Sequence, residues 1–123
     1  MKIPEEVKRW FESAKADLIK AKDNFNLGHY DLTSFLCQQS VEKSLKSIVM
    51  YQTKSFPKIH DLIRLGRLSK IEPEILKECE KLNYVYTETR YPDTSNRKFT
   101  KKESEEDIKS AELILKWAEK KLY

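Results

Sequence analysis

The chain has 123 residues, of which 36% are charged and 39% are hydrophobic, and its formal net charge is +4. We predict one domain over residues 1–123, because this hydrophobic fraction is too high for a disordered chain. The mild and interleaved positive charge argues against a dedicated nucleic-acid binder. The start of the chain is charged and amphipathic, unlike a secretory signal, and no apolar run approaches the ~20 residues that span a membrane. We therefore expect a cytoplasmic protein without a membrane span.

The first half of the chain predicts two long helices. Pro4 suits the first turn of a helix, and apolar residues recur at gaps of three and four until Gly28 ends the pattern. A second helix is expected from about Asp31 to Gln52, followed by a loop over 53–57. Apolar residues lie on more than one side of this second helix, which is typical of a helix at the centre of a bundle.

The second half predicts a short helix over 60–68, a longer one from Pro73 to about 87–90, and a last helix with a capping box of Thr100 and Glu103. No run shows sustained strand alternation. We therefore predict an all-α fold, a compact up-and-down bundle of four principal helices plus one short helix. The expected core comprises Trp10, Leu18, Phe35, Val41, Leu45, Leu82, Leu115 and Ala118.

A polar stripe interrupts the apolar second helix. Its members are spaced i, i+3, i+4 and i+7, which predicts one shared helical side: Gln39, Glu42, Lys43 and Lys46. Polar side chains on a mostly apolar helix need hydrogen-bond partners, or they face a groove or a partner. The alternative is a solvent-exposed stripe in which the Glu42–Lys46 ion pair contributes a few tenths of a kcal/mol.

Two further polar groups lie at turns. His60 and Asp61 stand where a loop meets the short helix, so Asp61 can cap that helix, while His60 is either a general base or a hydrogen-bonding anchor. Arg90 precedes a Tyr-Pro turn that ends at Asp93, and its rigid guanidinium suits an anion. The alternative for Arg90 is an architectural ion pair with Glu42. The two histidines and two cysteines are too scattered for a catalytic zinc site, so we expect no metal.

In this order, these motifs resemble those of the HEPN-domain family, here a small stand-alone prokaryotic member. The resemblance covers nearly the whole chain and rests on segments 14–18, 39–46, 59–62 and 90–93, with Tyr30 and Trp117. It implies a helical bundle, often a homodimer, that is commonly encoded beside a minimal nucleotidyltransferase. Such a pair is often a toxin–antitoxin module, and some members of the family are considered nucleotide-binding domains.

Many HEPN proteins are metal-independent ribonucleases, whose motif is an arginine followed four to six residues later by a histidine. This chain lacks that motif, because its histidines are His29 and His60 and the one arginine before them is Arg9. We therefore expect a noncatalytic homodimeric binding module, with a nucleotidyltransferase partner, no cofactor, and a nucleotide or RNA as ligand. The alternatives are a ribonuclease toxin with a cross-dimer site and a purely structural dimerisation domain. The expected ligand-binding groove comprises Gln39, Glu42, Lys43, Lys46, His60, Asp61, Arg90 and Asp93.

Overall fold

The structure, a computed structural model, describes residues 2–83, 85 and 99–123. Its helices are α1 (Glu5–Asn26), α2 (Tyr30–Thr53), α3 (Leu62–Leu68), α4 (Pro73–Asn83) and α6 (Lys101–Leu122), and the described residues contain no strand. The prediction of an all-α bundle is confirmed. Within this part of the chain, no helix is both long enough and apolar enough to cross a membrane.

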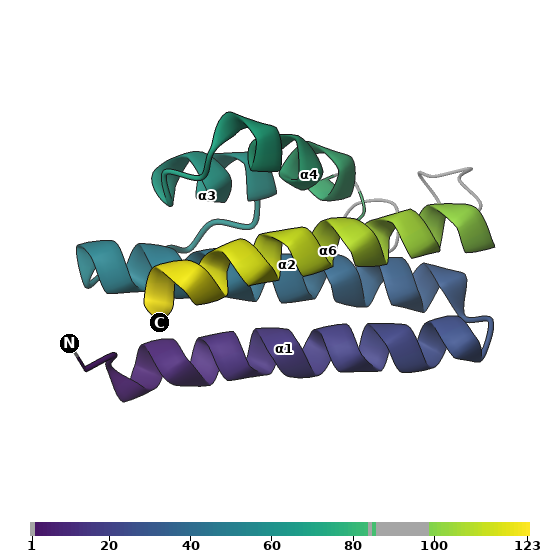
Figure 1. Ribbon diagram of the computed structural model, residues 1–123, viewed down its shortest axis with the longest axis horizontal. Coiled ribbons are helices and arrows are strands. Elements are labelled where there is room, and N and C mark those ends of the chain that lie inside the picture. The colour runs from purple at the N-terminus through teal and green to yellow at the C-terminus, as the bar shows by residue number, and fades with distance from the viewer. Residues whose placement is uncertain (1, 84, 86–98) are drawn as a thin grey trace.

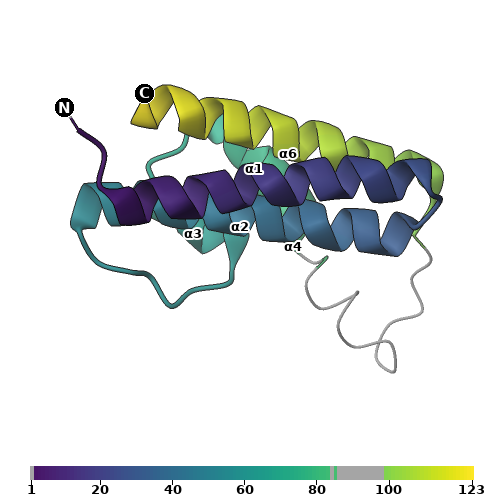
Figure 2. The same cartoon turned by 90° about the horizontal axis from the view of Figure 1, so that it is seen from below.

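Three long helices, α1, α2 and α6, lie side by side, while α3 and α4 pack on the side of α2 and α6 that faces away from α1 (Figure 1). Only α2 contacts each of the other four described helices, so it is the central element that the sequence pattern predicts. The connection between α2 and α3, residues 54–61, leaves the end of α2 and runs back beside it (Figure 2). We refer to this segment as the 54–61 loop.

The buried face of α1 differs from the predicted one at an aromatic position. Phe11 is fully buried, whereas Trp10 is only partly buried and packs at the edge of the core. One residue turns a helix by about 100°, so neighbouring aromatic residues compete for the same buried position. Phe35 on α2 is also only partly buried, and the core assignments of Trp10 and Phe35 are therefore wrong. The other predicted core residues are buried: Leu18, Val41, Leu45, Leu82, Leu115 and Ala118.

Small hydroxyl side chains let α2 lie close to its neighbours. Ser40, Ser44 and Ser47 are fully buried. The Ser40 hydroxyl donates to the carbonyl oxygen of Ala14 on α1 at 2.6 Å, and the other two donate to carbonyl oxygens of α2 itself. Each hydroxyl therefore has the partner that burial requires. The chain can thus bury α2 on nearly all sides without a continuous apolar surface.

The remaining boundaries follow from helix caps. The short helix α3 begins at Leu62 instead of the expected position 60, because the Asp61 side chain accepts hydrogen bonds from the backbone N–H groups of Ile63 and Arg64. Thr100 caps α6 in the same way, accepting from the N–H of Glu103, as the capping-box pattern predicts. The expected end of the fourth helix, at 87–90, lies outside the described residues.

Candidate ligand-binding site

Three of the predicted site residues meet at one carboxylate. Glu42 Oε2 lies 2.9 Å from Lys46 Nζ and 3.0 Å from His60 Nδ1. Glu42 and Lys46 lie on successive turns of α2, while His60 comes from the 54–61 loop. The side chains of Glu42 and Lys46 are 9% and 5% exposed, whereas that of His60 is 62% exposed. A single buried carboxylate therefore holds a buried ammonium group and a surface imidazole.

Two glutamines extend this cluster along α2. Gln38 Nε2 donates to the second carboxylate oxygen of Glu42, at 3.2 Å, and Gln39 Nε2 donates to Gln38 Oε1 at 2.7 Å. Gln39 therefore reaches Glu42 only through Gln38, a fully buried residue that the sequence analysis did not include. The signal that was available is the i, i+4 spacing of Gln38 and Glu42, which places them on the same side of the helix.

The 54–61 loop covers Lys46 with an aromatic ring. The Phe56 ring centroid lies 5.4 Å from Lys46 Nζ, a cation–π distance, and 4.9 Å from the ring centroid of Trp10 on α1. Phe56 and His60 thus fasten the same loop to α2, one through a ring and the other through a carboxylate. The interpretation of Glu42 and Lys46 as a solvent-exposed pair is wrong, because both side chains are buried. Neither Phe56 nor Trp10 was predicted to belong to the site.

The other predicted residues lie elsewhere. Lys43 points toward α1, where its Nζ lies 2.8 Å from Asp17 Oδ2 and donates to Ser13 Oγ at 2.9 Å. The expectation that Lys43 shares a side with Glu42 and Lys46 is therefore wrong: adjacent helical positions differ by about 100°, and α1 supplies a closer carboxylate. Asp61 is the cap of α3. Two predicted residues lie outside the described part of the chain: Arg90 and Asp93.

Both cysteine thiols are in apolar surroundings. Burial raises the pKa of the Cys79 thiol to about 12 and that of the Cys37 thiol further still, with smaller contributions from nearby carboxylates. The thiolate is the nucleophile and the metal ligand, so neither side chain is activated at neutral pH. Among the described residues, no group of three or more histidine, cysteine or acidic side chains is arranged to hold a metal ion.

Comparisons with known proteins match this architecture. The HEPN domain model matches residues 7–121. The chain is similar to TT1696 from Thermus thermophilus, with 27% identity and a TM-score of 0.85 over 94% of this chain and 98% of that one. It is similar to ST0689, an archaeal HEPN homologue, with 30% identity and a TM-score of 0.82 over the full length of both chains.

A HEPN domain protein of Thermotoga maritima, TM0613, shares the fold at 24% identity, with a TM-score of 0.73 over 93% of this chain and 97% of that one. No curated protein matches the chain significantly. The match over residues 7–121 and the full-length similarity to the archaeal homologue agree with the motifs of α2 and the 54–61 loop. The chain belongs to the HEPN domain family.

Proposed function

We propose that this HEPN protein is a noncatalytic, homodimeric binding module that binds a nucleotide and acts with a minimal nucleotidyltransferase in a toxin–antitoxin-like pair. The observation that supports ligand binding is the surface imidazole of His60, which the buried Glu42–Lys46 pair holds in place. A pre-positioned polar group binds a ligand with little loss of conformational entropy. An imidazole N–H can donate a hydrogen bond to the phosphate of a nucleotide.

Calorimetric titration with ATP and GTP tests this proposal. His60→Ala should weaken nucleotide binding about tenfold, or about 1.4 kcal/mol, and a thermal melt of the same variant checks that the fold is kept. His29→Ala is the matched control, because His29 is also exposed and its Nδ1 lies 3.2 Å from Asn24 Oδ1, away from the Glu42 cluster. Absence of nucleotide binding in the wild-type protein, or equal affinities for the two variants, would overturn the proposal.

Dimerisation is supported by the outer side of α2. Leu32 is exposed on this helix, and Phe35 and Leu36 beside it are only partly buried. Apolar side chains exposed on a central helix favour self-association through a two-fold interface. Sedimentation at micromolar concentration should show a dimer, and Leu32→Glu should shift it to monomer. A wild-type protein that sediments as a monomer throughout this range contradicts the homodimer.

The nucleotidyltransferase partner rests on family membership and is tested separately. A gene for a minimal nucleotidyltransferase should lie beside the gene for this chain, and the two products should copurify when expressed together. If no such gene lies nearby and no complex forms, a purely structural dimerisation domain becomes the better interpretation.

A metal-independent ribonuclease is the second candidate, and one contact favours it. The 3.0 Å contact between Glu42 and His60 Nδ1 orients the ring, as a carboxylate does for a general-base histidine. The sequence lacks the arginine–histidine motif of the family's ribonucleases, so this proposal ranks second. Cleavage of RNA in the presence of a chelator, abolished by His60→Ala and retained by His29→Ala, would establish it in place of the binding module.

A further inference from the structure

A pocket of about 190 Å³ lies between the start of α1 and the end of α2, beside the polar cluster. The buried side chains of Val7 and Met50 line it, together with the aromatic rings of Tyr51 and Phe56. Two aromatic rings and two apolar side chains form a surface on which a flat ring can lie. The pocket therefore has the composition of a site for a planar heterocycle.

Phe56 joins this pocket to the polar cluster. The same ring that lines the pocket lies over Lys46 Nζ, and its loop also supplies His60. A ligand against Phe56 thus lies next to the groups that we propose to bind a nucleotide. Phe56 therefore belongs both to the pocket and to the cluster.

The charged residues that line the pocket complement a nucleotide. Lys54, an exposed residue at the end of α2, supplies an ammonium group for a phosphate. Glu6, in the first turn of α1, supplies a carboxylate that can accept a hydrogen bond from an amino group on a base. Adenine, guanine and cytosine carry such an amino group, whereas uracil does not.

We propose that this pocket holds the nucleobase, stacked on Phe56, with the phosphates directed to Lys54 and His60. This inference rests on the proposed nucleotide binding. It assigns to the nucleobase the affinity that phosphate contacts alone do not supply. Stacking on an aromatic side chain is tolerant of base identity, so selectivity comes from Glu6. ATP should therefore bind more tightly than UTP, and both more tightly than inorganic tripolyphosphate.

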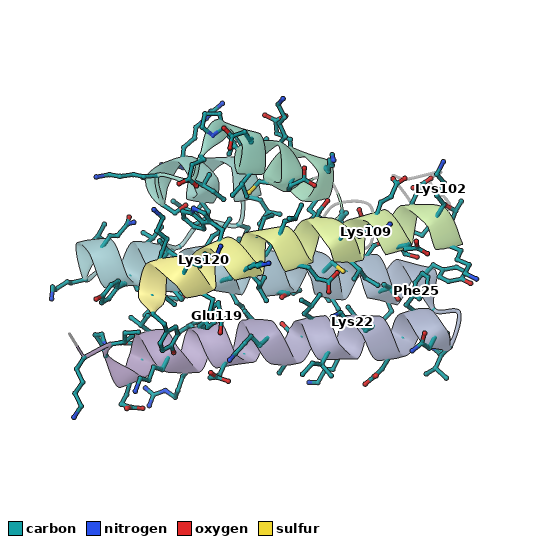
Figure 3. All side chains as sticks on the ribbon, in the orientation of Figure 1. Lys22, Phe25, Lys102, Lys109, Glu119 and Lys120 are labelled. Carbon is teal, nitrogen blue, oxygen red and sulfur yellow. The ribbon has the colours of Figure 1, made fainter. Side chains whose placement is uncertain are left out.

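The test compares ATP with tripolyphosphate in wild-type protein and two variants. Phe56→Leu should weaken ATP binding at least fivefold and leave tripolyphosphate binding unchanged. Phe25→Leu is its control, because Phe25 is a partly buried ring that packs on Tyr30 at the far end of α1 (Figure 3). This control should bind both probes as the wild type does.

The second variant does not depend on how the loop tolerates the loss of its aromatic ring. Lys54 has a φ of 60°, a left-handed conformation that glycine adopts without strain, so Lys54→Gly should fold at least as well as the wild type. It should weaken the binding of ATP and tripolyphosphate alike. Lys70→Gly is the matched control, because Lys70 is exposed and has a φ of 61° at a different turn.

The outcomes separate the pocket from the proposed function. If ATP binds and His60→Ala weakens it, but Phe56→Leu and Lys54→Gly bind like wild type, the base pocket is wrong and the nucleotide-binding module stands. If tripolyphosphate binds as tightly as ATP, the site recognises phosphate alone and the pocket is again overturned. If the wild-type protein binds neither probe, the proposed function fails and the pocket fails with it.

Discussion

Two ion pairs that start from consecutive residues of α2, Glu42 and Lys43, have almost the same N···O distance and different surroundings. Glu42–Lys46 has an N···O distance of 2.9 Å with side chains 9% and 5% exposed, and Lys43–Asp17 has a distance of 2.8 Å with side chains 27% and 10% exposed. The first pair lies under the 54–61 loop, while Lys43 stays partly in water. Because the two distances are nearly equal, any difference in what the pairs contribute to stability and to a ligand site must come from their surroundings, above all from the 54–61 loop.

Removing the carboxylate of the covered pair should have the largest effect. Glu42→Ala leaves the ammonium group of Lys46 buried without its counter-charge and releases His60 from its anchor. The free energy of unfolding should fall by about 3–5 kcal/mol, measured by chemical denaturation. A loss below about 1 kcal/mol would show that water reaches Lys46 and that the loop does not cover it.

A substitution at Leu45 tests whether α2 lies at the centre of the bundle. Leu45 is fully buried on α2. Leu45→Ala removes buried methyl groups and leaves a cavity, so we expect a loss of about 2–5 kcal/mol in unfolding free energy. Urea denaturation provides the measurement. A change below about half a kcal/mol would place this side of α2 at the surface.

Cys79 extends the comparison to a buried group without a charged partner. Burial raises its pKa from 9.0 to about 12, so folding favours the neutral thiol. The contribution of this shift to the free energy of unfolding is complete below pH 9 and is lost as the pH rises toward 12. The stability advantage of wild type over Cys79→Ala should therefore shrink by about 1–2 kcal/mol between pH 7 and pH 10.5. An advantage that stays constant over this range would mean that the thiol ionises as readily as in the unfolded chain.

Removing Lys43, the partly exposed lysine, should lower the free energy of unfolding least. Lys43→Ala removes a partly solvated ammonium group and takes one counter-charge from Asp17, whose side chain is 10% exposed. Because water reaches the Lys43 side of this pair and can solvate Asp17 once the lysine is gone, we expect a smaller loss of unfolding free energy than for Glu42→Ala in the same denaturation series. A loss equal to that of Glu42→Ala would remove the distinction between the two pairs.

The sequence predicts the helices well because their signals are local. Apolar spacing, Pro4, Gly28 and the Thr100 cap act over a few residues, and α2 has the apolar and small polar composition of a central helix. The offset between Trp10 and Phe11 is of another kind. Which of two adjacent rings is buried depends on how α1 packs against the rest of the bundle, and that packing has no local signal.

The site was predictable only in part, for the same reason. The i, i+4 spacing of Glu42 and Lys46 indicates their pairing, but His60 reaches them only through the path of the 54–61 loop. That path also brings in Phe56, which no polar motif indicates. Lys43 was assigned to the wrong side because its partner, Asp17, lies on another helix.

Mapping of backbone amide chemical shifts by NMR, during titration with ATP, shows whether a nucleotide binds at the 54–61 loop. We expect saturable shifts in the 54–61 loop and in the first turn of α1, with none around Lys43 and Asp17. Shifts confined to the Lys43–Asp17 side, or no shift at millimolar ATP, would contradict binding at this loop.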